Sequence, residues 1–185
     1  LHGRLVFMDQ FPALTEENLE NLMRSITPER SQMELEEVQT ADFAFSYGDK
    51  CRFRVAVGYQ RGTLAINMRV LPNRFLTFKD IGIPDTVKEI LTAPKGIFLV
   101  TGPTGSGKTT TLASMIQWVN NNRECHIVTI EDPIEYYFEA KKSIFTQREV
   151  RVDVPSFAEG TIRAMRMDPD VILVGEMRDP ATISA

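Results

Sequence analysis

One stretch of this sequence has the residues to hold a polyphosphate. Residues 102–109 read Gly-Pro-Thr-Gly-Ser-Gly-Lys-Thr and match the phosphate-loop pattern G-x-x-x-x-G-K-[ST] at every fixed position. Residues 96–101 before them form a short apolar run typical of a strand, and residues 110–119 after them carry apolar residues at helical spacing. A strand that turns through glycines into a helix directs several backbone N–H groups at one point, where phosphates bind.

The loop therefore predicts a site for ATP and Mg²⁺. We expect Lys108 to reach the β- and γ-phosphates and Thr109 to offer its hydroxyl to Mg²⁺. The alternative is a chance glycine-rich turn before a helix, and the flanking strand and helix patterns argue against it. The residues expected to contact the nucleotide are Gly102, Pro103, Thr104, Gly105, Ser106, Gly107, Lys108, Thr109 and Thr110.

A second apolar run, residues 171–174, leads through Gly175 to the carboxylate of Glu176. In an open parallel sheet the carboxyl ends of the strands meet at the ligand, so this pattern fits an acid placed beside the phosphates and Mg²⁺. Many buried strands end in an acidic residue, and the pattern gains its meaning from the phosphate loop earlier in the chain.

The sequence Glu131-Asp-Pro-Ile-Glu135-Tyr places three carboxylates directly after the apolar run 126–130. Carboxylates gathered at the end of one strand are costly unless they serve a cation or a proton transfer. ATP hydrolysis needs a base for the attacking water and a metal for the phosphates, and this cluster can supply both. The alternative is an acidic turn made rigid by Pro133.

Arg52 and Arg54 are two residues apart in a run of strand type, so both side chains are expected on one face. Arg61 and Arg69 lie in the same stretch. Two arginines on one face can bind a phosphate from outside the phosphate-loop domain and stabilise transition-state charge as arginine fingers do. A solvated sheet face explains the pattern alone equally well.

The sequence predicts structural roles for His126 and Trp118. His126 begins a strand-like run without a ligand partner nearby, which favours a hydrogen-bonded structural histidine over a catalytic one. Trp118 lies at core spacing on the helix after the phosphate loop, so we expect it to pack in the core.

Length and composition exclude several classes of protein. The 185 residues allow one large domain or two small ones, and a formal net charge of −4 gives no sign of a nucleic-acid partner. Cys51 and Cys125 lie far apart without a metal-ligand pattern, which predicts reduced thiols in a cytoplasmic protein. No apolar run approaches about 18 residues, so no membrane span is predicted. The chain starts at Leu1 without a methionine or signal peptide, and we expect it to be part of a longer protein.

Residues 1–71 predict a small α+β domain. Thr15 is expected to cap a first helix, and Thr27 a second helix that has Pro28 at its first position and runs to about Val38. The strands of the following meander are expected near residues 43–45, 52–57 and 65–70.

Residues 72–84 are the expected linker, and residues 85–185 predict the first part of a parallel α/β domain. Because few strands appear before Ala185, we expect this second domain to be cut short. Its helices are expected at 85–91, at 110–119, from the capping box at Ser156 to about Met167, and after Asp179. Its strands are expected at 96–101, 126–130 and 171–174.

Together these motifs resemble the secretion ATPase superfamily, the hexameric motors of type II and type IV secretion and of type IV pili. Within it, the chain is most similar to the pilus-retraction motors of twitching motility. The stretch from Arg52 to Val55, with Gln60-Arg61-Gly62, is similar to the PAS-like N-terminal domain of that family. The segments that carry the motor-domain resemblance are residues 102–111, 129–136, 147–150 and 168–179.

The resemblance implies a PAS-like domain followed by a truncated RecA-like phosphate-loop domain, with ATP held between them. It implies that residues 102–109 are the Walker A loop and that residues 131–136 are the acidic Asp box, with Glu135 as general base. Glu176 would be the Walker B glutamate near Mg²⁺ and water. The residues implied to lie near the metal are Thr109, Glu131 and Glu176. Arg52 and Arg54, helped by Arg61 and Arg69, would be brought to the nucleotide from the N-terminal domain.

The same resemblance implies a homo-hexamer that works at the pilus base on an inner-membrane platform protein, in the cytoplasm and peripheral to the inner membrane. The family's Gly-Thr-Leu-His-Thr segment is expected soon after Ala185, so these residues alone are expected to be inactive. Three alternatives stay open: a sister motor for pilus extension or type II secretion, a nucleotide-binding scaffold subunit without turnover, and a nucleic-acid translocase, which the acidic balance disfavours.

Overall fold

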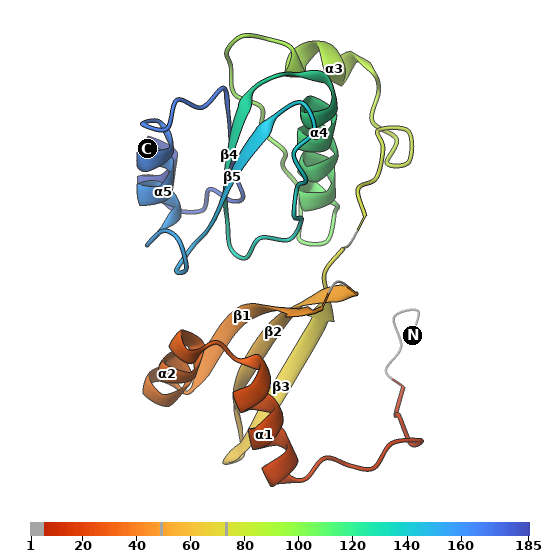
Figure 1. The fold of residues 1–185 in the computed structure, drawn as a ribbon, viewed down its shortest axis with the longest axis vertical. Helices are drawn as coiled ribbons and strands as arrows, with labels where there is room; N and C mark the ends of the chain where they lie inside the picture. The colour runs from red at the N-terminus through yellow and green to blue at the C-terminus, as the bar shows by residue number, and fades with distance from the viewer. Residues whose placement is uncertain (1–5, 49, 73) are drawn as a thin grey trace. The chain divides into compact units, whose positions relative to one another are not determined.

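The structure, a computed structural model, describes residues 6–48, 50–72 and 74–185. The chain forms two compact units, Leu1–Val70 and Leu71–Ala185, and both mix helices with a sheet (Figure 1). Each unit is described by itself below. Within the described residues, no helix combines the length and the apolar character needed to cross a bilayer.

The first unit has helices that cover one face of an antiparallel sheet with strand order β1-β2-β3. Its core contains Leu35 of the second helix, Phe43 of the first strand, and Val55 and Val57 of the central strand. Its elements are α1 (Glu16–Ile26), α2 (Glu29–Val38), β1 (Thr40–Tyr47), β2 (Cys51–Gln60) and β3 (Thr63–Val70).

The start of α1 agrees with the sequence, and the start of α2 differs by one residue. Thr15 Oγ1 accepts a hydrogen bond from the backbone N–H of Asn18, and Asn18 Oδ1 accepts one from the backbone N–H of Thr15. Pro28, expected at the first helical position of α2, is instead the residue before it and provides no side-chain cap. Proline has no backbone N–H and its φ is already fixed, so it can occupy either position at little cost.

The second unit is built on a parallel sheet with strand order β5-β4-β6. Its helices are α3 (Thr86–Leu91), α4 (Lys108–Asn122), α5 (Phe157–Ala164) and α6 (Pro180–Ser184). Its strands are β4 (His126–Glu131), β5 (Ile144–Glu149) and β6 (Val171–Val174). Ser156 caps α5 as expected, accepting from the N–H of Glu159, although the helix ends at Ala164 and not near Met167.

Two expectations about the strands of this unit are wrong. Residues 96–101 form no strand, and Ile97 and Leu99 are 88% and 61% exposed. An apolar run becomes a strand only where a neighbouring backbone accepts its hydrogen bonds, and none of the described strands pairs with it. Conversely, β5 was missed because its sequence, Ile-Phe-Thr-Gln-Arg-Glu, is mostly polar at its C-terminal end.

The two faces of the central strand β4 pack against different helices. Ile127 faces a cluster with Ile116 and Val119 of α4, whereas Val128 and Ile130 face Ala164 of α5. Figure 1 shows α4 and α5 on opposite sides of this sheet. Because residues in a strand alternate between faces, Thr129 and Glu131 share the α4 side with Ile127.

The residues expected to form the linker pack as part of the second unit. The Phe75 ring lies 5.2 Å from the Tyr136 ring and 4.9 Å from the Phe138 ring, measured between centroids. Phe78 is buried and stacks on Trp118 at 6.4 Å, which places Trp118 at the core as expected.

Candidate functional site

The phosphate-loop residues run directly into the first turn of α4. Gly102, Gly105 and Gly107 have φ angles of 155°, 79° and 90°, which disfavour residues with a side chain. At Gly102 an added Cβ would lie 2.7 Å from Ser106 Oγ, so the loop is closed tightly there. The N–H groups of the first turn of α4 have no partner within the helix, which leaves them available to an anion.

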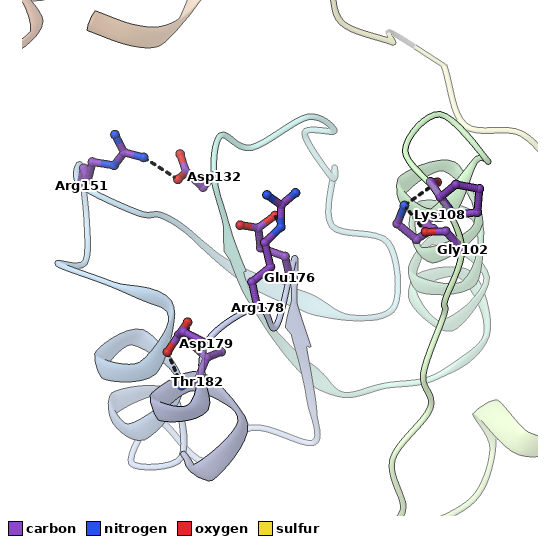
Figure 2. Close-up of polar contacts among 9 residues, drawn as sticks. Gly102, Lys108, Asp132, Arg151, Glu176, Arg178, Asp179 and Thr182 are labelled. Atoms are coloured by element: carbon purple, nitrogen blue, oxygen red, sulfur yellow. Dashed lines mark hydrogen bonds and ion pairs between the residues drawn. The ribbon is translucent and has the colours of Figure 1, made fainter.

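Lys108, the first residue of α4, is turned back onto its own loop. Its Nζ donates to the carbonyl oxygens of Gly102, at 3.0 Å, and Pro103, at 2.8 Å (Figure 2). The Lys108 ammonium can exchange these two carbonyls for phosphate oxygens without a movement of the helix, because only the lysine side chain has to rotate.

Four polar residues gather on the α4 side of the sheet, at the carboxyl ends of β4 and β5. Thr129 pairs in register with Gln147, and Glu131 pairs with Glu149, so all four side chains share that face. Thr129 Oγ1 donates to Glu131 Oε1 at 2.7 Å, and Gln147 Nε2 lies 3.4 Å from the same oxygen. The carboxyl end of the sheet therefore carries a hydrogen-bonded polar cluster beside the helix that follows the phosphate loop.

Burial raises the pKa of Glu131, which is only 7% exposed, above its ordinary value. Hydrogen bonds from the Thr129 hydroxyl, the Gln147 amide and the Glu135 backbone N–H act in the opposite direction. The negative charge of the Glu135 side chain adds to the upward shift of the Glu131 pKa. The two carboxylates are therefore close enough for one to influence the protonation of the other.

A small pocket brings the loop helix and the strand ends together. Its lining includes Thr109 of α4, Glu131 and Tyr136 at and after the end of β4, and Gly175, which directly follows β6. The other lining residues are Leu112, Ala113, Phe138 and Leu173. The structure thus places Thr109, Glu131 and the residue next to Glu176 around one pocket.

The other two glutamates expected at the site differ in their surroundings. Glu135 is half-buried, and its backbone N–H bonds to the Glu131 carboxylate. Glu176 has a side chain that is 41% exposed and forms an ion pair with Arg178, with 3.0 Å between Oε2 and Nε. Figure 2 shows Glu176 directed to Arg178 and Lys108 directed to its loop, well apart in the view.

An ion pair that was not predicted from the sequence lies at the same end of the sheet. Arg151, just after β5, pairs with Asp132 at 2.9 Å (Figure 2). Thr129 and Gln147 lie in segments that carry the family resemblance, residues 129–136 and 147–150, but sequence reasoning assigned a role to neither of them. The signal available for both was their two-residue spacing from Glu131 and Glu149, which places them on one face only once β5 is known to pair with β4.

The arginines expected to reach the nucleotide belong to the first unit. Arg52 and Arg54 on β2 alternate with core residues and so lie on the sheet face away from α1 and α2. Arg69 on β3 is directly opposite Arg54 in register, and Arg61 is in the turn between the two strands with φ 51°. All four arginines therefore lie within the first unit.

His126 has the structural role predicted for it. Its Nε2 is 2.9 Å from Thr146 Oγ1, and its Nδ1 is 3.1 Å from the carbonyl oxygen of Met167. The carboxylate of Asp170 accepts its backbone N–H at 2.8 Å. Over the part of the chain that the structure describes, no group of three or more His, Cys, Asp and Glu side chains is arranged to hold a metal.

The raised pKa of Glu131 predicts a pH-dependent effect of the Glu131→Gln substitution. Because the folded state favours the protonated carboxyl, stability that is present below the unfolded pKa of about 4.3 is lost as the pH rises through the folded pKa. Glutamine stays neutral, so the unfolding free energy of the variant relative to wild type should increase over that interval and then level off. Urea unfolding at several pH values without nucleotide or Mg²⁺ measures this, with fluorescence of the single tryptophan, Trp118, as the probe.

Glu139→Gln is the matched control, because the Glu139 side chain is 86% exposed. It should not reproduce the pH-dependent gain. A constant difference between Glu131→Gln and wild type across the same pH range would contradict the assignment of a burial-driven shift to Glu131.

The chain is similar in sequence to proteins of known families. A family described as type II/IV secretion system protein matches residues 39–185. The type IV pilus retractation ATPase PilT of Pseudomonas aeruginosa is 44% identical over 173 residues, which cover 93% of this chain and 50% of that protein. The twitching motility protein of Neisseria gonorrhoeae is 43% identical over 173 residues, covering 93% of this chain and 46% of that protein.

The fold is also similar to a solved structure. The crystal structure of the pilus retraction motor PilT with bound ADP superposes with a TM-score of 0.95 and 49% sequence identity, over 100% of this chain and 54% of that one. The chain therefore spans about half the length of the relatives that it matches. The match over residues 39–185 and the similarity to PilT show that the chain belongs to the type II/IV secretion system protein family.

Proposed function

We propose that this chain is part of an ATP-hydrolysing motor subunit that powers type IV pilus retraction, the basis of twitching motility. The observation that carries the proposal is the pocket in which Thr109, directly after the loop lysine, meets Glu131 and Gly175 at the ends of two adjacent strands. Similarity to relatives named for pilus retraction and twitching motility supports the choice among motors.

In the proposed reaction, water attacks the γ-phosphate in line with the bond that breaks. Glu135 orients the water and accepts its proton, which is the role of a general base. Lys108 leaves the carbonyls of Gly102 and Pro103 and donates to the β- and γ-phosphates, while N–H groups of the loop hold the remaining oxygens. Residues Gly102 to Thr110 form the binding site.

The residues at the pocket fit Mg²⁺, since hydroxyl and carboxylate oxygens are its preferred protein ligands. Thr109 and Glu131 line the same pocket and would hold it, with Glu176 next to the pocket residue Gly175. A Mg²⁺ site of this kind needs few protein ligands, because phosphate oxygens and water complete the octahedron. When bound, Mg²⁺ neutralises charge on the β- and γ-phosphates.

We further propose that the first unit is a PAS-like domain and the second the N-terminal part of a RecA-like domain. The antiparallel sheet with both helices on one face supports the first assignment, and the parallel sheet with a loop-to-helix phosphate site supports the second. Arg52 and Arg54 would contribute charge to the nucleotide in an assembled homo-hexamer. That assembly would act in the cytoplasm on a platform protein at the inner-membrane base of the pilus.

Deletion of the gene, together with phosphate release by the purified full-length gene product, tests the proposal. Loss of a retraction motor should abolish twitching while pili remain on the cell surface, and the purified protein should release phosphate from ATP without added DNA. Loss of the pili would identify an extension motor instead, and secretion defects with normal pili would identify a secretion motor. Absence of phosphate release would identify a scaffold subunit, and strict dependence on DNA a translocase.

A further inference from the structure

Glu135 lies in a segment that has no regular secondary structure. Residues 132–140, between β4 and β5, form neither helix nor strand. Backbone N–H and C=O groups that are withdrawn from water still need partners, and a helix or sheet ladder does not supply them here. Ile134 and Tyr136, the residues on either side of Glu135, are both buried. The position of Glu135 therefore depends on whatever holds the backbone around it.

Gln147 on β5 holds this backbone on the C-terminal side of Glu135. Its Nε2 donates to the carbonyl oxygen of Tyr136 at 2.9 Å, and its Oε1 accepts from the N–H of Phe138 at 2.9 Å. The amide of glutamine donates and accepts at once from one flat group, which lets it make both bonds. The same Nε2 lies 3.4 Å from Glu131 Oε1, which links the amide to the pocket.

Two carboxylates hold the backbone at Glu135 and on its N-terminal side. Glu149 Oε2, two residues further along β5, accepts the N–H of Ile134 at 3.0 Å. The Glu131 carboxylate accepts the N–H of Glu135 itself. Side chains from two paired strands thus bond the backbone at four positions around a single glutamate, and a strand pair is a rigid support for such a group.

We propose that Gln147 is a positioning residue for ATP hydrolysis, which fixes the backbone beside Glu135 and thereby the direction of its carboxylate. The proposal rests on the function proposed above, in which Glu135 is the base. The hydrogen-bond partners of the Gln147 side chain are Glu131, Tyr136 and Phe138, and none of these residues belongs to the phosphate loop. Loss of Gln147 should therefore reduce turnover and leave nucleotide binding intact.

The test compares Gln147→Leu with wild type in the full-length gene product. The kcat for ATP should fall about 100-fold, the loss expected when a reacting group is displaced by about 1 Å. The KM for ATP and the Kd for a fluorescent ADP analogue should stay within about threefold of wild type, because the interaction acts only in the chemical step. A merely structural role would lower thermal stability without this separation of kcat from KM.

Thr146→Val is the matched control on the same strand. Thr146 contacts His126 at 2.9 Å from the opposite face of the sheet, so its replacement removes a hydrogen bond of β5 without touching residues 132–140. Its kcat should stay at the wild-type value. Should Gln147→Leu fail to fold, Gln147→Glu carries the same comparison, because it keeps the size and the acceptor for Phe138 but loses the donor to Tyr136.

Glu135→Gln and the double variant separate this inference from the proposed function. If Gln147 acts through Glu135, adding Gln147→Leu to Glu135→Gln should not lower the residual rate further. Wild-type kcat in Gln147→Leu, with Glu135→Gln inactive, overturns the positioning role and leaves the base assignment standing. Wild-type kcat in Glu135→Gln overturns the base assignment and the positioning role together.

Discussion

Replacing Lys108 with alanine in the full-length gene product should abolish ATP turnover, with a loss in kcat of at least about 100-fold. The Lys108 ammonium is the group on this loop that can leave two backbone carbonyls and carry a full positive charge to the γ-phosphate. Charge builds on the phosphate oxygens as the bond to the leaving group breaks, and no other side chain of residues 102–109 is a cation. Phosphate release under saturating ATP and Mg²⁺ measures the effect.

Two further variants define what the Lys108 result means. Lys95→Ala removes an exposed lysine upstream of the loop and should leave kcat unchanged. Lys108→Arg keeps the charge but replaces a compact ammonium with a wide planar group, so it should also be inactive if geometry matters. Steady turnover by Lys108→Ala at the wild-type rate would refute the whole assignment of the phosphate site.

The second large effect is expected from Glu135→Gln, which should reduce kcat by about 10² to 10⁴, the usual contribution of a general base. Glutamine has the same shape and leaves the backbone N–H of residue 135 to bond with Glu131 as before. The Kd for ADP should therefore remain within a few-fold of wild type. Single-turnover phosphate release together with ADP binding distinguishes the loss of chemistry from the loss of binding.

Glu139→Gln is the control for that substitution. Glu139 lies in the same segment, and its side chain is 86% exposed and forms a 3.4 Å ion pair with Lys141. The kcat of the Glu139→Gln variant should match that of the wild type. A Glu135→Gln enzyme with turnover within tenfold of wild type would transfer the role of base to another carboxylate, and Glu176 would be examined first.

Local sequence signals predicted the parts of the fold that are decided locally. The helix expected at 110–119 is present as α4, although it begins two residues earlier, and the caps at Thr15 and Ser156 follow from residues only a few positions apart. Strand pairing is decided elsewhere in the chain. That is why residues 96–101 appeared as a strand and residues 144–149 did not, although only the second run has β4 beside it.

The candidate site likewise contains residues that could be predicted from local motifs and residues whose role depends on the fold. The loop and the acids at 131–136 and 176 could be predicted because each is a short motif with its own chemistry. The role of Gln147 could not be predicted. Gln147 lies in a segment that resembles the family, but only the fold places the carbonyl of Tyr136 and the N–H of Phe138 against its amide. Nor does the motif show that Lys108 donates hydrogen bonds to the carbonyls of Gly102 and Pro103.

The two hydrogen bonds of Lys108 to the carbonyls of Gly102 and Pro103 affect which ligands the loop can favour. A phosphate that approaches has to replace two existing acceptors, so the free energy gained is the difference between two sets of partners. Inorganic phosphate or a monophosphate offers few oxygens to the lysine while also meeting the loop amides, whereas a chain of phosphates can satisfy both at once. The two hydrogen bonds of Lys108 therefore favour a chain of phosphates over a single phosphate, independently of any contact with base or sugar.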